Sequence, residues 1–189
     1  MMNLHTPVTD KYAEYKDNWF YHGDCRIFLA GPIRGARDWQ KEVEGWIKDD
    51  NCEVFSPRWE ENDKYKLEFN EAKQMGWEHS HLRASDIIYY GLVNPEEGDG
   101  GDEDHDYAQT TRIELGAYLM NISINGNSRN KYAIVYLDDK IKGDTYIKDF
   151  CKRYNTNLRI FLFTDYEESI NKLRELISRV NNINMNMEG

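Results

Sequence analysis

The chain has few of the residues that build disulfide-stapled, zinc-bound or membrane-spanning proteins. Its three cysteines, Cys25, Cys52 and Cys151, lie far apart and form no CxxC or Cys/His cluster, so we expect neither a disulfide framework nor a metal site. No apolar run approaches the roughly 18 residues that cross a bilayer, and the charged amino-terminal segment does not resemble a signal peptide. We therefore expect a cytoplasmic protein with no membrane partner.

Positive charge is also scarce. The sequence has 24 Lys and Arg against 34 Asp and Glu, which gives a formal net charge of -10. Because surfaces that bind polymeric nucleic acid are basic, we expect no such partner. A small nucleotide stays possible, since a local arginine pocket does not show in the net charge. A length of 189 residues suits one domain with a substantial core.

Short apolar runs alternate with helical patterns along the chain. The runs predict buried strands at residues 26–30, 53–55, 86–93, 132–137 and 158–163. Apolar spacings of three and four residues predict helices near residues 39–47, 70–84, 111–124, 145–154 and 170–180. In the first helix, Trp39 and Trp46 both fall on the predicted core stripe. This alternation predicts an α/β fold, a flavodoxin-like or Rossmann-like open parallel sheet of five strands with helices on both faces.

The pattern weakens at both ends of the chain. Residues 1–24 are polar and aromatic without a clear period, which predicts an extension on the domain surface. Residues 25–181 then form the domain, and residues 182–189, rich in Asn and Met, form a flexible tail.

The segment around Glu114 indicates chemistry. Thr111-Arg112-Ile113-Glu114-Leu115-Gly116-Ala117 places one carboxylate in the first turn of the predicted helix. A second carboxylate, Asp86, opens the third predicted strand. Glycosyl transfer needs such a pair, one to attack the sugar and one to manage the proton of the leaving group. The alternative for Glu114 is a capping box, Thr111-x-x-Glu114, in which the glutamate bonds the backbone at the helix start.

Ligands of open α/β sheets bind beyond the carboxyl ends of the strands, where the strand order reverses. The turn Gly31-Pro32-Ile33-Arg34, after the first predicted strand, lies at that edge. A residue that opens a strand, such as Asp86, would lie away from it, whereas Tyr89 and Tyr90 lie nearer and are alternative contacts.

Three arginines and one tryptophan follow the first two predicted strands. Arg34, Arg37 and Arg58 are either ordinary surface residues or ligands of a 5′-phosphate, for which the planar guanidinium is well suited. Trp59 could stack on a base.

The loop at residues 94–106 carries seven acids and three glycines. Asp102, Asp104 and Asp106 match the first ligand positions of a calcium-binding loop, but Tyr107 and Ile113 replace its glycine and final glutamate. We interpret the segment as a solvated loop that can act as a lid over the site.

Six short motifs occur in a familiar order. They are FLAGPI (28–33), DWQKE (38–42), FSPRW (55–59), WE (77–78), ASDIIYY (84–90) and IELG (113–116). Together, over about residues 26–137, they resemble the nucleoside 2-deoxyribosyltransferase superfamily, and most closely its divergent branch, frequent in phages, with a PR motif after the second strand. The resemblance implies enzymes that exchange or hydrolyse the base of a 2′-deoxynucleoside or its 5′-monophosphate. It also implies no metal or organic cofactor, and a homodimer or higher oligomer whose neighbouring subunits complete the site.

The resemblance assigns roles to individual residues. Glu114 matches the nucleophile, Asp86 the aspartate that contacts the base and handles its proton, and the Gly31 turn the part that wraps the substrate. Our candidates for substrate contacts are Gly31, Pro32, Ile33, Arg34, Arg58, Trp59, Tyr90 and Asp106. Two positions depart from the pattern. Ala108 stands where well-known members hold the sugar with an aspartate, for which Asp106 is the nearest substitute, and Phe28 stands where some place a tyrosine.

The predicted reaction is cleavage or exchange of the N-glycosidic bond through a covalent glycosyl ester of Glu114. Two alternatives stay open. The first is a hydrolase of nucleoside 5′-monophosphates, and the second is a non-catalytic domain that binds or senses nucleotides.

Overall fold

The computed structural model describes residues 1–7, 24–58, 71–96, 107–124, 131–155 and 159–187. The strands in this part of the chain are β1 (Asn3–His5), β2 (Cys25–Ala30), β3 (Cys52–Phe55), β4 (Ile87–Leu92), β5 (Tyr132–Leu137) and β6 (Ile160–Phe163). The helices are α1 (Trp39–Ile47), α2 (Glu71–Ala84), α3 (Gln109–Ile124), α4 (Asp144–Tyr154) and α5 (Tyr166–Met187).

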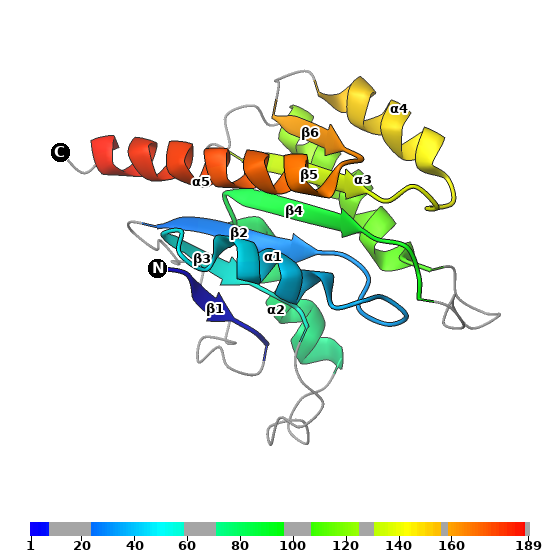
Figure 1. The fold of residues 1–189 in the computed structure, drawn as a ribbon, viewed down its shortest axis with the longest axis horizontal. Helices are drawn as coiled ribbons and strands as arrows, with labels where there is room; N and C mark the ends of the chain where they lie inside the picture. Colours follow the sequence, from blue (N-terminus) through cyan, green and yellow to red (C-terminus); the bar gives the residue numbers. More distant parts are fainter. Residues whose placement is uncertain (8–23, 59–70, 97–106, 125–130, 156–158, 188–189) are drawn as a thin grey trace.

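All these strands form one parallel sheet in the order β1-β3-β2-β4-β5-β6 (Figure 1). From β3 to β6 this is the doubly wound order of flavodoxin-like folds, which confirms the predicted fold class. The number of strands differs, because β1 pairs with β3 at the edge and makes the sheet six-stranded. The sequence Asn3-Leu4-His5 contains a single apolar residue, so no apolar run predicted this strand within the supposed extension.

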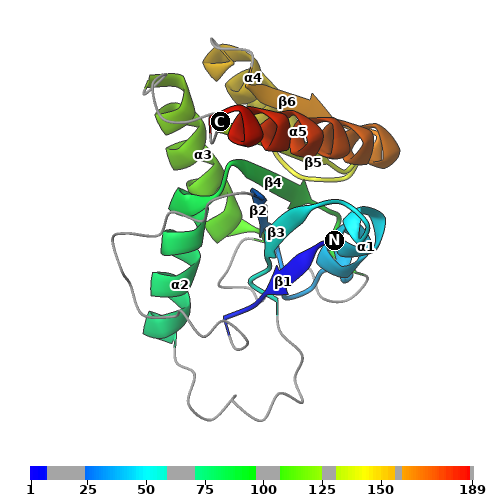
Figure 2. The same cartoon turned by 90° about the vertical axis from the view of Figure 1, so that its left-hand side faces the viewer.

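Helices cover both faces of the sheet. Helices α1 and α5 pack on one face, and α2, α3 and α4 on the other, as Figure 2 shows. Every residue of β2, β4 and β5 is buried, as expected for parallel strands covered on both sides. The covered faces leave the carboxyl edge of the sheet, with its loops, as the place for a site.

Trp39 determines how α1 packs on the sheet. Its ring is fully buried, and its indole nitrogen donates to the Pro32 carbonyl at 3.0 Å. A Cβ at Gly31 would lie 2.4 Å from the Trp39 ring, and one at Gly91 would lie 2.5 Å from it. The two glycines therefore make room for the indole, which gives Gly31 a packing role. Trp46, in contrast, is 52% exposed, so its predicted place in the core is wrong.

Replacing Gly91 by alanine tests this packing. Because the new methyl group would overlap the Trp39 indole, we expect the free energy of unfolding to fall by about 1–3 kcal/mol in urea denaturation. The control is Gly45→Ala in α1, whose Cβ would meet nothing within 4 Å. In a helix that substitution should be neutral or stabilise by roughly 0.5–1 kcal/mol. Equal stability of Gly91→Ala and wild type would refute the close contact with Trp39.

The last helix is longer than the sequence predicted. It begins at Tyr166 and continues through Met187, across most of the supposed tail. Asn181 holds this end, since its side chain accepts from the Cys25 backbone at 2.8 Å and donates to the Asn51 carbonyl at 2.7 Å. Across the described segments, we find no helix with the length and apolarity that a membrane span requires.

Candidate active site

Glu114 lies in the second turn of α3, which begins at Gln109. The helix starts after Ala108, whose φ of 59° is left-handed and whose carbonyl accepts from the Arg112 backbone at 3.0 Å. Thr111 is therefore inside the helix rather than at its N-cap. The capping-box alternative for Glu114 is wrong, and so is the predicted position in the first turn. The carboxylate is left available for chemistry.

Glu114 is partly buried beside a second carboxylate, Glu78 of α2. Desolvation raises the pKa of Glu114 most, the negative charge of Glu78 raises it further, and together they bring it to about 7. Burial also raises the pKa of Glu78, while a hydrogen bond from the Gln74 amide, at 2.8 Å, works in the opposite direction. Helices α2 and α3 lie on the same side of the sheet (Figure 2). A carboxylate pair of this kind can hold one proton between its two members near neutral pH.

Two tyrosine hydroxyls share this environment. Tyr90 of β4 is fully buried, and Tyr118 lies one helical turn after Glu114 in α3. Within the described segments, neither hydroxyl has a hydrogen-bond partner. Burial and then the charge of Glu114 raise the pKa of both phenols, that of Tyr118 to about 12, so both stay protonated donors. Unpaired buried donors cost stability, which indicates a role in the site.

The structure does not bring Asp86 to this pair. Asp86 immediately precedes β4, at the amino end of the strand, whereas α3 and Glu114 follow its carboxyl end. Its carboxylate forms a two-pronged ion pair with Arg26, with Arg26 Nε 3.0 Å from Oδ2 and Nη2 2.9 Å from Oδ1. The Arg26 backbone also donates to Oδ2, at 3.0 Å, and both residues are more than 90% buried. We therefore assign Asp86 a structural role instead of the proton-handling role.

Glu78 is the residue that the sequence analysis missed. It belongs to the WE motif, so its presence was noted but no role was given to it. Trp77, its neighbour, is buried and stacks on His81 with ring centroids 4.2 Å apart, which fixes α2 against the sheet. The sequence feature that could have indicated Glu78 was a carboxylate next to a tryptophan, in the predicted helix that precedes β4.

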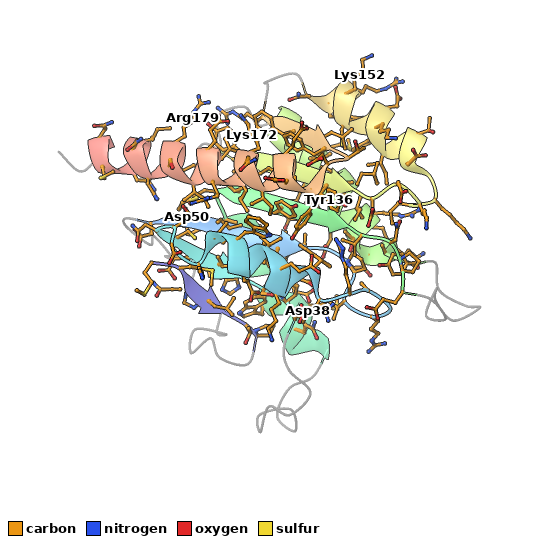
Figure 3. The ribbon with its side chains drawn as sticks, viewed as in Figure 1. Asp38, Asp50, Tyr136, Lys152, Lys172 and Arg179 are labelled. Carbon is orange, nitrogen blue, oxygen red and sulfur yellow. The ribbon has the colours of Figure 1, made fainter. Side chains whose placement is uncertain are left out.

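Arg58, a predicted phosphate ligand, is bound instead to the chain between β2 and α1. Its guanidinium donates to the Gln40 side chain at 3.0 Å and to the Ile33 carbonyl at 3.1 Å. It also pairs with Asp38, at 3.2 Å, at the start of α1 (Figure 3). These contacts engage Nε and Nη2 of the guanidinium with the protein itself.

The remaining predicted contacts lie in different places. Pro32 is buried, Ile33 is partly buried and Arg34 is exposed in the same turn. The Arg37 guanidinium lies 5.7 Å from the centre of the Tyr166 ring, among the residues of the α1 and α5 face. Trp59 and Asp106 lie outside the described residues. No group of three His, Cys, Asp or Glu side chains in the described part of the chain is arranged to hold a metal ion.

A family model described as "Nucleoside 2-deoxyribosyltransferase like" matches residues 24–123, more than half of the chain. The chain belongs to this family. The match runs from β2 to α3 and includes Glu78, Tyr90 and Glu114, so the predicted superfamily is confirmed and a general role in nucleoside processing is supported.

Other comparisons add little. No curated protein matches the chain. One similar solved structure, "Crystal structure of conserved protein from Enterococcus faecalis V583", has 14% sequence identity and a TM-score of 0.45. The match covers 82% of this chain and 98% of that chain. So distant a likeness says nothing about activity.

Proposed function

We propose that the protein cleaves or exchanges the N-glycosidic bond of a 2′-deoxynucleoside or its 5′-monophosphate. Glu114 is the nucleophile and Glu78 the general acid and base. The observation that carries this proposal is the carboxylate pair itself, partly buried on the helices beside β4. Burial, and then the charge of Glu78, raise the pKa of Glu114 to about 7. Family membership supports a nucleoside as the substrate class.

In the reactive form of the pair, its one proton lies on Glu78 and Glu114 is ionised. In the first step, a carboxylate oxygen of Glu114 attacks C1′ from the face opposite the base. The C1′–N bond breaks through an oxocarbenium-like transition state, and its electron pair passes to the base nitrogen, which takes a proton from Glu78. The products are a glycosyl ester of Glu114, the neutral base and ionised Glu78. A 2′-deoxy sugar reacts more readily, since a 2′-hydroxyl would withdraw electrons from the developing cation.

In the second step, water or a second base attacks C1′. Glu78 takes the proton of this nucleophile, the ester bond breaks, and Glu114 leaves as a carboxylate. Two displacements give overall retention at C1′. Water as the acceptor makes the protein a hydrolase, and a base as the acceptor makes it a transferase.

The two alternatives from the sequence fare differently. Recognition of a 5′-phosphate remains a prediction, and with Arg58 bound to the protein it now depends on the exposed Arg34. The carboxylate pair disfavours a purely sensing domain. Burying Glu114 beside Glu78 lowers the stability of the folded protein, and a domain without catalytic activity would gain nothing from that loss.

A homodimer or higher oligomer also remains a prediction. Ile113 and Met120 of α3 are 67% and 40% exposed, and Tyr146 of α4 is 72% exposed. Apolar side chains on the helix that carries Glu114 fit a second copy of the chain packed there.

Replacing Glu78 by glutamine should separate its role as the general acid from its effect on the pKa of Glu114. Without the acid, kcat/KM on a natural deoxynucleoside should fall by about 10²- to 10⁴-fold. Without the neighbouring charge, the pKa of Glu114 should fall, so the acidic limb of the kcat/KM profile should move to lower pH. A deoxyriboside with a nitrophenolate leaving group, which needs no proton, should lose much less in its first step. Stopped-flow and steady-state kinetics across pH 5 to 9 measure all three effects.

The matched control for this variant is His79→Gln, at an exposed position next to Glu78 in α2. It should leave rates and pH profile unchanged. Equal losses by Glu78→Gln on the natural and the nitrophenyl substrate would show that Glu78 does not act as the acid.

A further inference from the structure

Arg58 follows β3 and bonds to a single short segment of the chain. Its Nε contacts the Gln40 and Asp38 side chains. Its Nη2 donates to the carbonyls of Ile33, Ala36 and Arg37, at 3.1, 3.4 and 3.3 Å. All these acceptors lie in residues 33–40, between the end of β2 and the first turn of α1. We call residues 31–38 the β2–α1 turn.

Three of the acceptors are backbone carbonyls of an irregular segment. Such carbonyls must find donors outside a helix or sheet ladder. A guanidinium offers five N–H groups in a rigid plane, so one arginine can bond several carbonyls that face it from different positions. In Arg58, Nη2 reaches the three carbonyls while Nε reaches the Gln40 and Asp38 side chains. A lysine ammonium has a single nitrogen and cannot reach both groups of acceptors at once. The side chain of Arg58 is 23% exposed, which limits competition from solvent.

The β2–α1 turn lies against the end of β4. A Cβ at Gly31 would come within 2.6 Å of the Gly91 carbonyl oxygen. Ala36 forms an antiparallel bridge with Pro95, and the Glu96 backbone donates to the Gly35 carbonyl at 2.9 Å. Tyr90, which senses the charge of Glu114, immediately precedes Gly91. The turn held by Arg58 therefore lies at the carboxyl end of β4, the strand that carries Tyr90 of the proposed active site.

We propose that Arg58 is a positioning residue, which holds the β2–α1 turn in the conformation that binds substrate and does not itself bind a substrate phosphate. The effect on catalysis depends on the proposed function, whereas the effect on the turn does not. Loosening the turn should weaken the binding of a nucleoside and of its 5′-monophosphate by the same factor. A phosphate ligand, in contrast, would affect the monophosphate alone.

The experiment compares Arg58→Ala and Arg58→Lys with wild type. Hydrogen exchange of peptides covering residues 31–38 and 93–96 should become at least about ten-fold faster in both variants, with other core peptides unchanged. On a deoxynucleoside and its 5′-monophosphate, kcat/KM should fall by up to about 10²-fold by equal factors, mainly through KM. Arg58→Lys, which retains the positive charge, should restore little of the hydrogen-exchange protection or of kcat/KM.

Arg153→Ala is the matched control, because this exposed arginine of α4 pairs with Asp149 far along the chain from the turn. It should change neither readout. Arg34→Ala serves as the comparison for direct phosphate binding. If Arg58→Ala proves unstable, Arg58→Lys gives the same test with a smaller perturbation.

Two results would overturn the inference. One is unchanged exchange in the turn with a loss confined to the 5′-monophosphate, which would make Arg58 a phosphate ligand. The other is wild-type hydrogen exchange and wild-type kcat/KM in Arg58→Lys, which would leave positive charge as the only contribution of Arg58. If wild type processes neither substrate while Arg58→Ala still loosens the turn, the proposed function fails and the structural part of the inference is supported.

Discussion

Glu114→Gln is expected to give a folded protein with at least about a thousand-fold lower kcat/KM on deoxynucleosides. An amide cannot attack C1′ to form the ester, so the first step is lost whatever the leaving group. The loss should be as large on a nitrophenyl deoxyriboside as on a natural substrate, which distinguishes Glu114 from Glu78. Steady-state kinetics with both substrates and circular dichroism for folding provide the measurement.

The same variant should be more stable than wild type above neutral pH. The pKa of Glu114 is raised from 4.5 to about 7 in the folded protein, so wild type loses stability as pH rises between these values. This shift corresponds to about 3 kcal/mol at pH 8, and Glu114→Gln should recover much of it. Below pH 4.5 the two proteins should be equally stable in urea denaturation.

An exposed glutamate of α5, Glu167, provides the control. Glu167→Gln should keep full activity and show no comparable gain at pH 8. A Glu114→Gln protein with near wild-type turnover would remove Glu114 from the mechanism, because no other step of the proposed reaction can replace the ester.

Asp86→Ala is expected to lower the free energy of unfolding by about 3–5 kcal/mol, because it breaks a buried ion pair. The substitution leaves the Arg26 guanidinium buried at the amino end of β2 without its two-pronged partner, and it also removes the acceptor of the Arg26 backbone. The protein that remains folded should keep its kcat, since Asp86 is not beside Glu114. Urea denaturation and active-site titration together measure the two effects.

Asp149→Ala, which breaks the exposed Asp149–Arg153 pair, should cost no more than about 0.5 kcal/mol. The double variant Arg26→Met/Asp86→Leu should recover much of the lost stability, because an apolar pair no longer carries a buried charge. An Asp86→Asn protein with wild-type stability and no turnover would instead support the proton-handling role that the sequence suggested.

The fold was predictable because its signal is local. Apolar runs such as those of β4 and β5 mark strands buried on both faces, and alternation with helices restricts the topology to a parallel sheet. β1 escaped because Asn3–His5 is an edge strand with little apolar burial, and its pairing with β3 is decided by residues 50 positions away. The full length of α5 was not predicted for a similar reason, since polar contacts of Asn181 with distant residues hold its end.

The site was only partly predictable. Glu114 stood out by its motif, but its distance from the helix start depends on Ala108 adopting a left-handed φ, which no sequence rule for alanine predicts. Asp86 was a plausible second carboxylate until the structure showed it at the wrong end of its strand. The roles proposed for Glu78 and Arg58 could not be predicted from the sequence. Only the folded structure shows that Glu78 lies beside Glu114 and that Arg58 bonds to the β2–α1 turn.

The most direct test of the central claim is to trap the glycosyl ester. Glu78→Gln protein is mixed with the nitrophenyl deoxyriboside, quenched in acid, and analysed by intact mass and peptide mapping. The first step needs no acid for this leaving group, and the second lacks its base, so the ester should accumulate. One added deoxyribosyl group is expected on the peptide that contains Glu114. Nitrophenolate release without any adduct, or an adduct on a different residue, would contradict it.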